Sequence, residues 1–168
     1  MTHVWLGDKS LSALEYIATF LRERDREEVF ALRYEEDPAR LAMDTFALGE
    51  FQWIAYADQT PAASIGAFPV WPGVWQCWAY GTDRWPEVVR TLTKHVRRFM
   101  RPALLNSDAR RLQCWAMESH DDARKWLKLL GAQEEARLDN YGKNGQTFVC
   151  YSWRRGMTER TDVLRCQG

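Results

Sequence analysis

The chain has 168 residues, of which 46% are hydrophobic and 27% charged, and its formal net charge at pH 7 is zero. This size and balance predict a single domain over residues 1–153, followed by a polar C-terminal tail at 154–168, and they exclude a disordered chain. Zero net charge argues against the basic surface that nonspecific nucleic-acid binding requires. No apolar run is long enough to span a membrane, and the N-terminus lacks the basic residues followed by an apolar stretch that are typical of a secretion signal.

The first part of the chain predicts two helices after a short extended start. Apolar residues recur at helical spacing from Ser10 to Leu21, with Ser10 as the N-cap. The run Arg22 to Glu28 carries charges of alternating sign and is interpreted as a solvated connection. A second helix is expected to begin at Pro38, because proline suits a first helical turn, and to stop at Gly49.

Three strands are expected next. The runs Phe51 to Ala57 and Ala62 to Phe68 are aromatic and apolar, and the turn residues between them predict a hairpin. A break at Pro69 to Gly73 leads into a third strand, Val74 to Tyr80, which Gly81 closes.

The rest of the chain alternates helices and strands. A helix from Pro86 to Met100 has one apolar face and one basic face, and the basic face is interpreted as solvated. A strand at Arg111 to Met117 precedes a helix that opens with the capping-box pattern Ser119-x-x-Asp122 and ends at Gly131. Two last strands are expected at Ala136 to Tyr141 and at Thr147 to Trp153.

The four cysteines, Cys77, Cys114, Cys150 and Cys166, match neither a zinc-binding nor a CxxC spacing, so no metal site is expected. The first three fall in strands that are expected to be neighbours, and free buried thiols are favoured over disulfides. The nine Trp residues are typical either of a core or of an assembly interface.

The order of these elements predicts an α+β fold with a mixed central sheet of about six to seven strands flanked by about four helices. The segment Ser119 to Ala132 resembles the fourth-helix signature of the GNAT acyltransferases, in which an Asn is followed by an Ala, an aromatic residue and Leu-Gly-Phe. Three shorter segments, Arg24–Val29, Trp78–Trp85 and Trp126–Gly131, resemble the internal virion protein family of podoviruses, which is itself GNAT-like.

These resemblances imply two alternative functions. The first is a phage protein of the virion interior or of head–tail assembly, noncatalytic or weakly catalytic, with other virion proteins as partners and no cofactor. Its location would be the virion interior or the host cytoplasm, and self-association into a homo-oligomer is left open. The second is an N-acetyltransferase that depends on acetyl-CoA.

In an active GNAT enzyme, the strand that corresponds to Val74 to Tyr80 separates from the strand that corresponds to Arg111 to Met117. Acyl-CoA lies in the gap between them. Backbone N–H groups at the N-terminus of the helix between these strands hold its pyrophosphate. The cofactor-binding residues implied by this resemblance are Gly81, Thr82, Asp83, Arg84 and Trp85. Only one of them is a glycine, Asp83 would repel a phosphate, and Pro86 removes one donor, so an ordinary helix cap is the alternative interpretation.

The resemblance also implies a Tyr that protonates the departing thiolate, one turn before the end of the fourth helix. Leu127 occupies that position and cannot donate a proton, while Tyr141 lies outside it. His120 takes the Asn position of the signature, where the GNAT cleft opens, and is the candidate catalytic residue. Its neighbours Ser119 and Asp121 are interpreted as helix-cap residues rather than as a triad, because neighbours on one helix turn point apart.

Overall fold

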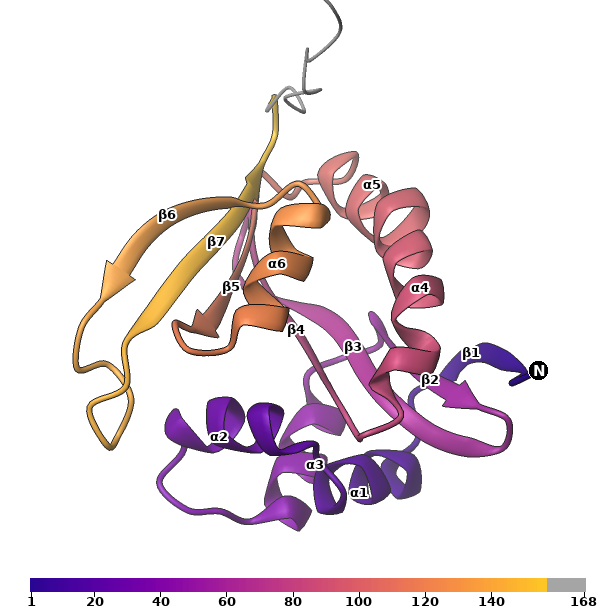
Figure 1. Cartoon of the computed structure of the whole chain (residues 1–168). Coiled ribbons are helices and arrows are strands. Elements are labelled where there is room, and N and C mark those ends of the chain that lie inside the picture. The colour runs from indigo at the N-terminus through magenta and orange to yellow at the C-terminus, as the bar shows by residue number, and fades with distance from the viewer. Residues whose placement is uncertain (157–168) are drawn as a thin grey trace, which may run out of the picture.

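The computed structural model describes residues 1–156, which form a seven-stranded sheet with helices on both faces (Figure 1). The strand order is β1-β2-β3-β4-β5-β7-β6, and among these described strands only β4 and β5 pair in parallel. This mixed sheet confirms the predicted fold class. Most of the expected tail, residues 157–168, lies outside the described part of the chain.

The first half of the chain contains β1 (Val4–Asp8), three helices and a three-stranded meander. The helices are α1 (Leu11–Thr19), α2 (Glu23–Ala31) and α3 (Pro38–Ala47). The meander consists of β2 (Gln52–Ala57), β3 (Thr60–Trp71) and β4 (Val74–Gly81).

The second half begins with one long helical segment. It is made of α4 (Trp85–His95), the π-helical turn η1 (Val96–Met100) and α5 (Arg101–Leu105). The elements that follow are β5 (Arg111–Met117), α6 (Asp121–Leu129), β6 (Gln133–Leu138) and β7 (Phe148–Arg154).

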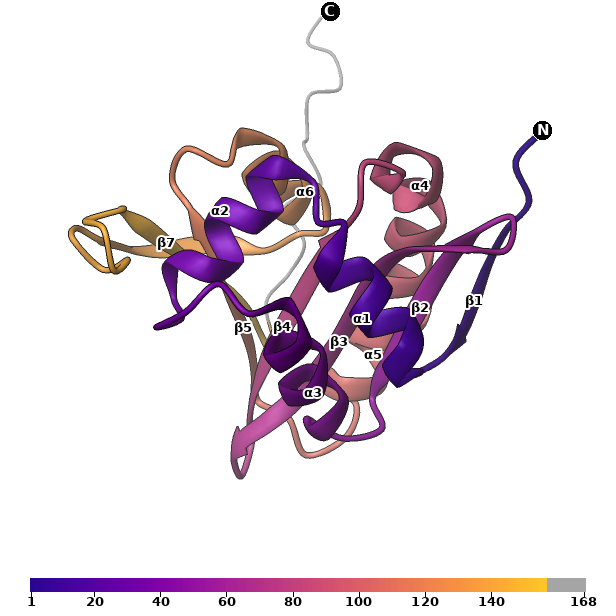
Figure 2. The same ribbon diagram turned by 90° about the horizontal axis from the view of Figure 1, so that it is seen from below.

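The helices form two layers on opposite faces of the sheet. Helices α1, α2 and α3 cover one face, as the view from below shows (Figure 2), and α4, α5 and α6 cover the other (Figure 1). Buried side chains such as Leu14 and Ile17 pack on Ile54 in the first layer, whereas Val88 and Leu92 belong to the larger core of the second layer. Each layer therefore buries one set of alternating strand residues.

Local sequence chemistry explains several helix ends. The Ser10 hydroxyl accepts from Ala13 N at 3.4 Å at the start of α1, and the Asp37 carboxylate accepts from Arg40 N at 3.0 Å at the start of α3, where Pro38 follows as expected. Gly131 follows α6 with φ +82°, a backbone conformation that glycine adopts without strain.

The prediction of a solvated connection at Arg22 to Glu28 is wrong, because most of this run belongs to α2. Glu23 and Asp25 lie in its first turn, where acidic side chains stabilise the helix dipole. The helix buries Asp25, Phe30 and Ala31, so a carboxylate takes part in fixing it to the sheet. Apolar periodicity alone could not detect such a helix.

Further boundaries differ from the sequence expectation. The helix expected to end at Met100 continues to Leu105 through η1 and α5. Strand β3 continues through the predicted break to Trp71, because a register shift between Pro69 and Trp71 accommodates the proline. The N-cap of α6 is His120 rather than Ser119, and β6 begins at Gln133 rather than at Ala136.

Cys77, Cys114 and Cys150 lie on β4, β5 and β7 and are free thiols, as expected, while Cys166 lies outside the described residues. Within residues 1–156, no three His, Cys, Asp or Glu side chains are grouped so that they could hold a metal ion. In the same part of the chain, no helix combines the length and the apolar character that crossing a membrane requires.

Candidate functional site

The candidate site lies where β4 and β5 separate. The two strands pair at only three positions, Val74 with Arg111, Trp75 with Leu112 and Gln76 with Gln113. Beyond Gln76, β4 pairs only with β3, and β5 pairs only with β7. A gap therefore opens between the carboxyl ends of two parallel strands, which is where ligands bind in open sheets of this kind.

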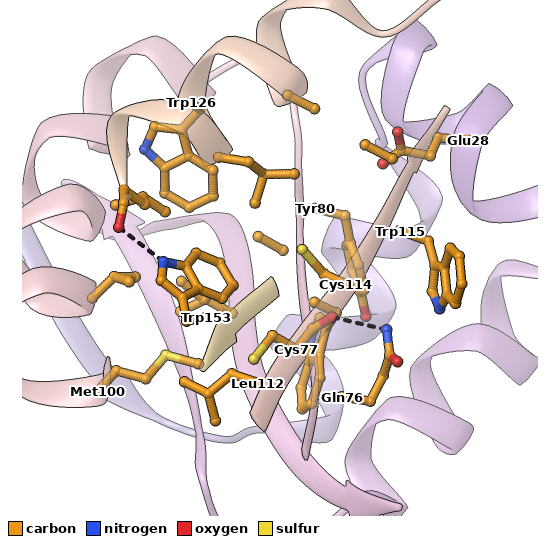
Figure 3. Close-up of a pocket in the computed structure, with 18 of the residues that line it drawn as sticks. Glu28, Gln76, Cys77, Tyr80, Met100, Leu112, Cys114, Trp115, Trp126 and Trp153 are labelled. Carbon is orange, nitrogen blue, oxygen red and sulfur yellow. Dashed lines mark hydrogen bonds between the residues drawn. The ribbon is translucent and has the colours of Figure 1, made fainter. Parts of the chain in front are cut away.

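A cavity of about 200 Å³ fills this gap and reaches both faces of the sheet. In Figure 3, Met100, Trp126 and Trp153 lie on one side of the cavity, and Glu28 and Trp115 lie on the other. The thiols of Cys77 and Cys114 lie between the two groups. Its walls are mostly apolar. Burial raises the pKa of the Cys77 thiol to about 12 and raises the pKa of Cys114 well above its ordinary value, so neither is a thiolate at neutral pH.

Helix α2 closes one end of the gap with two carboxylates that lie one turn apart. Gly81 N, at the end of β4, donates to Asp25 Oδ2 at 2.7 Å, and Met117 N, at the end of β5, donates to Glu28 Oε2 at 2.7 Å. Arg22 N donates to Gly81 O at 3.0 Å. The helix thus takes the place of the strand partners that β4 and β5 lose when they separate.

Of the two α2 carboxylates, Asp25 and Glu28, it is Glu28 that also lines the cavity. Burial raises the pKa of Glu28 to about 7, although the neighbouring His120 and the Met117 N–H both act to lower it. A carboxyl group with this pKa exchanges a proton near neutral pH, which is a property of a general base.

His120 is buried at 1% exposure and lies behind the cavity rather than in its wall. Its Nε2 lies 2.8 Å from Asp25 Oδ1, and its Nδ1 accepts from Ala123 N at 3.4 Å as the α6 N-cap. Burial disfavours the charged ring, but the Asp25 hydrogen bond and the charges of Glu28 and Asp25 outweigh it, so the pKa of His120 is raised. The structure therefore places His120 where it can position Asp25.

Arg22 completes the cluster on the side of α4. Its Nε lies 2.9 Å from Asp25 Oδ1, an ion pair without hydrogen-bond geometry, and its guanidinium lies 4.5 Å from the centre of the Trp85 ring. Asp25 is thus surrounded by a cation, a histidine and a backbone N–H, which together compensate the cost of burying its charge.

The predicted cofactor residues Gly81, Thr82, Asp83, Arg84 and Trp85 form the turn into α4. Four of the five amides donate within the protein: Thr82 N to Ala62 O at 2.8 Å, Arg84 N to Thr82 Oγ1 at 3.2 Å, Trp85 N to Thr82 O at 2.9 Å and Gly81 N to Asp25 Oδ2 at 2.7 Å. The Arg84 guanidinium binds Glu87 and Asp58. This turn therefore fits a pyrophosphate poorly, because a pyrophosphate needs several free donors.

The position expected for the proton donor holds Leu127, which is buried at 8% exposure and lines the cavity. The neighbouring Trp126 Nε1 donates to Thr93 Oγ1 at 2.8 Å, away from the cavity. Tyr141 lies beside Trp115, with ring centres 5.6 Å apart, and is absent from the cavity wall. The sequence interpretation missed Asp25 and Glu28, although two acids three positions apart in a charged run are a signal of one helical face.

Solved structures similar to this chain include a GNAT-family acetyltransferase from Bacillus anthracis (TM-score 0.63, 7% identity, 94% of this chain and 100% of that chain). Another is the ribosomal-protein-S18-alanine N-acetyltransferase from Escherichia coli, with a TM-score of 0.64 and 16% identity over 95% of this chain and 98% of that chain. A third is Ard1 from Thermoplasma volcanium, with a TM-score of 0.64 and 13% identity over 90% of this chain and 97% of that chain. These likenesses extend over nearly the whole of both chains.

No protein-family model matches the chain. No curated protein matches it either. The resemblance to the internal virion proteins of podoviruses therefore gains no support, and a virion role with virion partners stays a prediction. The structural likeness, by contrast, agrees with the residues Ser119 to Ala132 that suggested it, and it shows that the chain has the fold of the GNAT acetyltransferases.

Proposed function

We propose that this chain is an N-acyltransferase that binds an acyl thioester in the gap between β4 and β5. The observation that carries the proposal is the apolar cavity where these strands stop pairing, with the Glu28 carboxyl at its edge. The similar structures from Bacillus anthracis and Escherichia coli are described as acetyltransferases, which supports acyl transfer as the class of reaction.

The edge of β4 supports binding of an extended, amide-containing group. Gly81 directs its N–H and C=O away from β3, toward Asp25 and Arg22. Backbone groups alternate in direction along an antiparallel strand, so those of Ala79 also point toward the gap. The pantetheine arm of an acyl thioester carries amides that match such an edge.

Glu28 supports the chemical step. An amine attacks a thioester only as its neutral form, so the acceptor must lose a proton to a base. Glu28 engages Met117 N through Oε2, which leaves Oε1 for the acceptor. With its pKa raised to about 7, this carboxylate is a stronger base than an ordinary glutamate.

The turn into α4 indicates which part of the donor is recognised. Because most of its amides are already engaged, the nucleotide and pyrophosphate of a CoA thioester contribute little to binding. We therefore expect acetyl-CoA and S-acetylpantetheine to bind with affinities within about threefold of each other. Such a ratio means that their binding free energies differ by well under about 1 kcal/mol.

Calorimetry and thermal unfolding with the two thioesters test the binding step. A rise in melting temperature that increases with ligand concentration is expected for both, because a ligand of the folded state alone stabilises it. The substitution Glu28→Gln should leave thioester binding intact but slow thiol release in the presence of a panel of amines by about 100-fold or more. Glu27→Gln, on the exposed side of the same helix, is the matched control. No shift with either thioester at millimolar concentration would refute the proposal.

A further inference from the structure

The acceptor of the proposed reaction has to lie against Glu28, on the side of α2, because the arm of the thioester takes the edge of β4. Glu28 and Leu32, the C-cap of α2, are four residues apart, so they lie on one side of the helix end, and both line the cavity. Leu32 is 43% exposed, so the cavity reaches the surface here. The acceptor therefore enters through a mouth between the end of α2 and β5.

Trp115 forms the β5 side of this mouth. It precedes Met117 by two residues, so the two side chains point to the same face of the strand, about 7 Å apart. Met117 N is the group that holds Glu28, and Trp115 packs against a cluster of Met117, Ala31 and Phe148 at the end of α2. In Figure 3, Trp115 and Glu28 lie on the same side of the cavity. An aromatic ring thus faces the acceptor beside the carboxyl group.

Trp115 differs from the other tryptophans that line the cavity. The indole N–H groups of Trp78, Trp126 and Trp153 donate to protein atoms at 3.2, 2.8 and 2.9 Å, which fixes these rings as parts of the wall. Within residues 1–156, the N–H group of Trp115 has no such partner. Its ring is held instead by stacking on Tyr141, with ring centres 5.6 Å apart and an angle of 29° between the planes. The part of the ring that lines the cavity is therefore available to a ligand.

The Tyr141 ring that supports Trp115 is itself anchored. It meets Phe148 edge-on, with ring centres 5.9 Å apart. The connection between β6 and β7, which carries Tyr141, is tied to α2 because Lys143 N donates to Ala31 O at 2.8 Å. The stacked pair is thus a rigid aromatic surface before any ligand arrives, and such a surface binds a flat ring at low entropic cost.

We infer that the acceptor is an arylalkylamine, an amine joined to a flat aromatic ring by a chain of two or three carbon atoms. The ring stacks on Trp115 beside Leu32, and the chain spans the distance to Glu28 Oε1. The inference names the acceptor class and rests on the proposed function. In the transfer step the amine nitrogen bonds to the thioester carbonyl carbon and gives a proton to Glu28 Oε1. The C–S bond breaks, and the thiolate leaves and is protonated by water.

Calorimetry tests the inference by measuring the binding of amines with and without S-acetylpantetheine. The series is benzylamine, phenethylamine, phenylpropylamine, cyclohexylethylamine, hexylamine and ethanolamine. Phenethylamine or phenylpropylamine should bind most tightly. Phenethylamine should bind at least about threefold more tightly than cyclohexylethylamine, because a flat ring stacks on an indole face and a saturated ring does not. The same order is expected in kcat/KM for thiol release.

The substitution Trp115→Leu removes the ring and keeps an apolar side chain. It should weaken phenethylamine binding by about tenfold and hexylamine binding by less than about threefold. Trp115→Phe retains a ring and should restore most of the affinity for phenethylamine, which separates lost stacking from a loosened fold. Trp71→Leu makes the same change at a tryptophan that is 57% exposed and lies outside the cavity wall, and it should alter neither affinity. S-acetylpantetheine should bind all four chains with affinities within about threefold of one another.

Different failures have different meanings. If thioesters bind but no amine does, if phenethylamine and cyclohexylethylamine bind equally, or if Trp115→Leu weakens all amines alike, the inference is overturned and the proposed function stands. Loss of S-acetylpantetheine binding in Trp115→Leu also overturns the inference, because Trp115 would then belong to the donor site. Phenethylamine binding that Trp115→Leu weakens, without binding of any thioester, supports the aromatic amine site and overturns the proposed function. No binding of any amine or thioester overturns both.

Discussion

Asp25 and Glu28 each use a carboxylate oxygen to satisfy a backbone N–H group that the separated strands leave without a strand partner. The two residues nevertheless differ in their surroundings. Asp25 is compensated by Arg22 and by His120, whereas burial dominates at Glu28 and raises its pKa to about 7. Two carboxylates one helical turn apart are thus assigned different tasks by their environments, one structural and one suited to proton transfer.

Replacing Glu28 should change the pH dependence of stability. Its pKa rises from 4.5 to about 7 on folding, so between these values the folded chain holds a proton that the unfolded chain has lost. The free energy of unfolding therefore falls as pH rises through this window, by about 3 kcal/mol in total. Glu28→Gln remains neutral and can still accept from Met117 N. In urea unfolding at pH 4.5, the free energy of unfolding of Glu28→Gln should be no greater than that of the native chain. At pH 8 it should be greater than that of the native chain.

The control for this prediction is Glu27→Gln, at an exposed position of the same helix. Its unfolding free energy should follow that of the native chain at every pH. If Glu28→Gln and the native chain lose stability in parallel between pH 5 and pH 8, the raised pKa of Glu28 is contradicted. His120 also has a raised pKa and weakens the fold as pH rises, so the informative quantity is the difference between the two chains.

His120 has two structural tasks that substitutions can separate. His120→Ala removes both the contact with Asp25 and the cap of α6, and it should cost about 3 kcal/mol, because it leaves a buried carboxylate short of a partner. His120→Asn restores a favourable N-cap without reaching Asp25, and it should recover about 1 kcal/mol. Thermal and urea unfolding measure both changes. Equal stability of the two variants would contradict the capping role.

Helix α2 marks the limit of what periodicity in the sequence could predict. The ends of α1, α3 and α6 follow from apolar spacing, caps and Gly131, and these elements were predicted nearly to their boundaries. Helix α2 is charged along most of its length, and what fixes it to the sheet includes hydrogen bonds to Gly81 and Met117, which are distant in the sequence. Such a helix becomes predictable only once the strand ends are known to lie unpaired beside it.

The pairing of β3 with β4 gives a prediction about the cavity wall. Gly66 lies opposite Trp78, and a Cβ atom at Gly66 would overlap the Trp78 ring and lie 2.7 Å from Gln52 Cβ. Gly66→Ala should therefore destabilise the fold by about 2 kcal/mol, as overpacking does. In a Trp78→Phe background the smaller ring leaves room, so the same substitution should cost about 1 kcal/mol. A double-mutant cycle in urea measures the difference, and strictly additive costs would contradict the contact.

At the scale of the molecule, the order of elements was enough to predict the sheet, but not the gap within it. The strands β4 and β5 are both apolar, and nothing in Val74 to Gly81 or Arg111 to Met117 marks the point at which pairing stops. Their separation depends on what lies between and beside them, including Trp153 from β7, Trp126 from α6 and the carboxylates of α2. A site assembled from so many elements is a property of the tertiary fold.

The gap should also be detectable in the unfolding volume of the whole molecule. Pressure unfolds proteins because internal voids disappear, and a cavity of about 200 Å³ adds to this volume change. Ala79→Leu fills part of the cavity, so its unfolding volume should be smaller in magnitude than that of the native chain by some tens of mL/mol. Ala136→Leu, on exposed β6, should leave it unchanged. Tryptophan fluorescence under pressure measures all three chains. Equal volumes for the native chain and Ala79→Leu would mean that no dry void exists between the strands in solution.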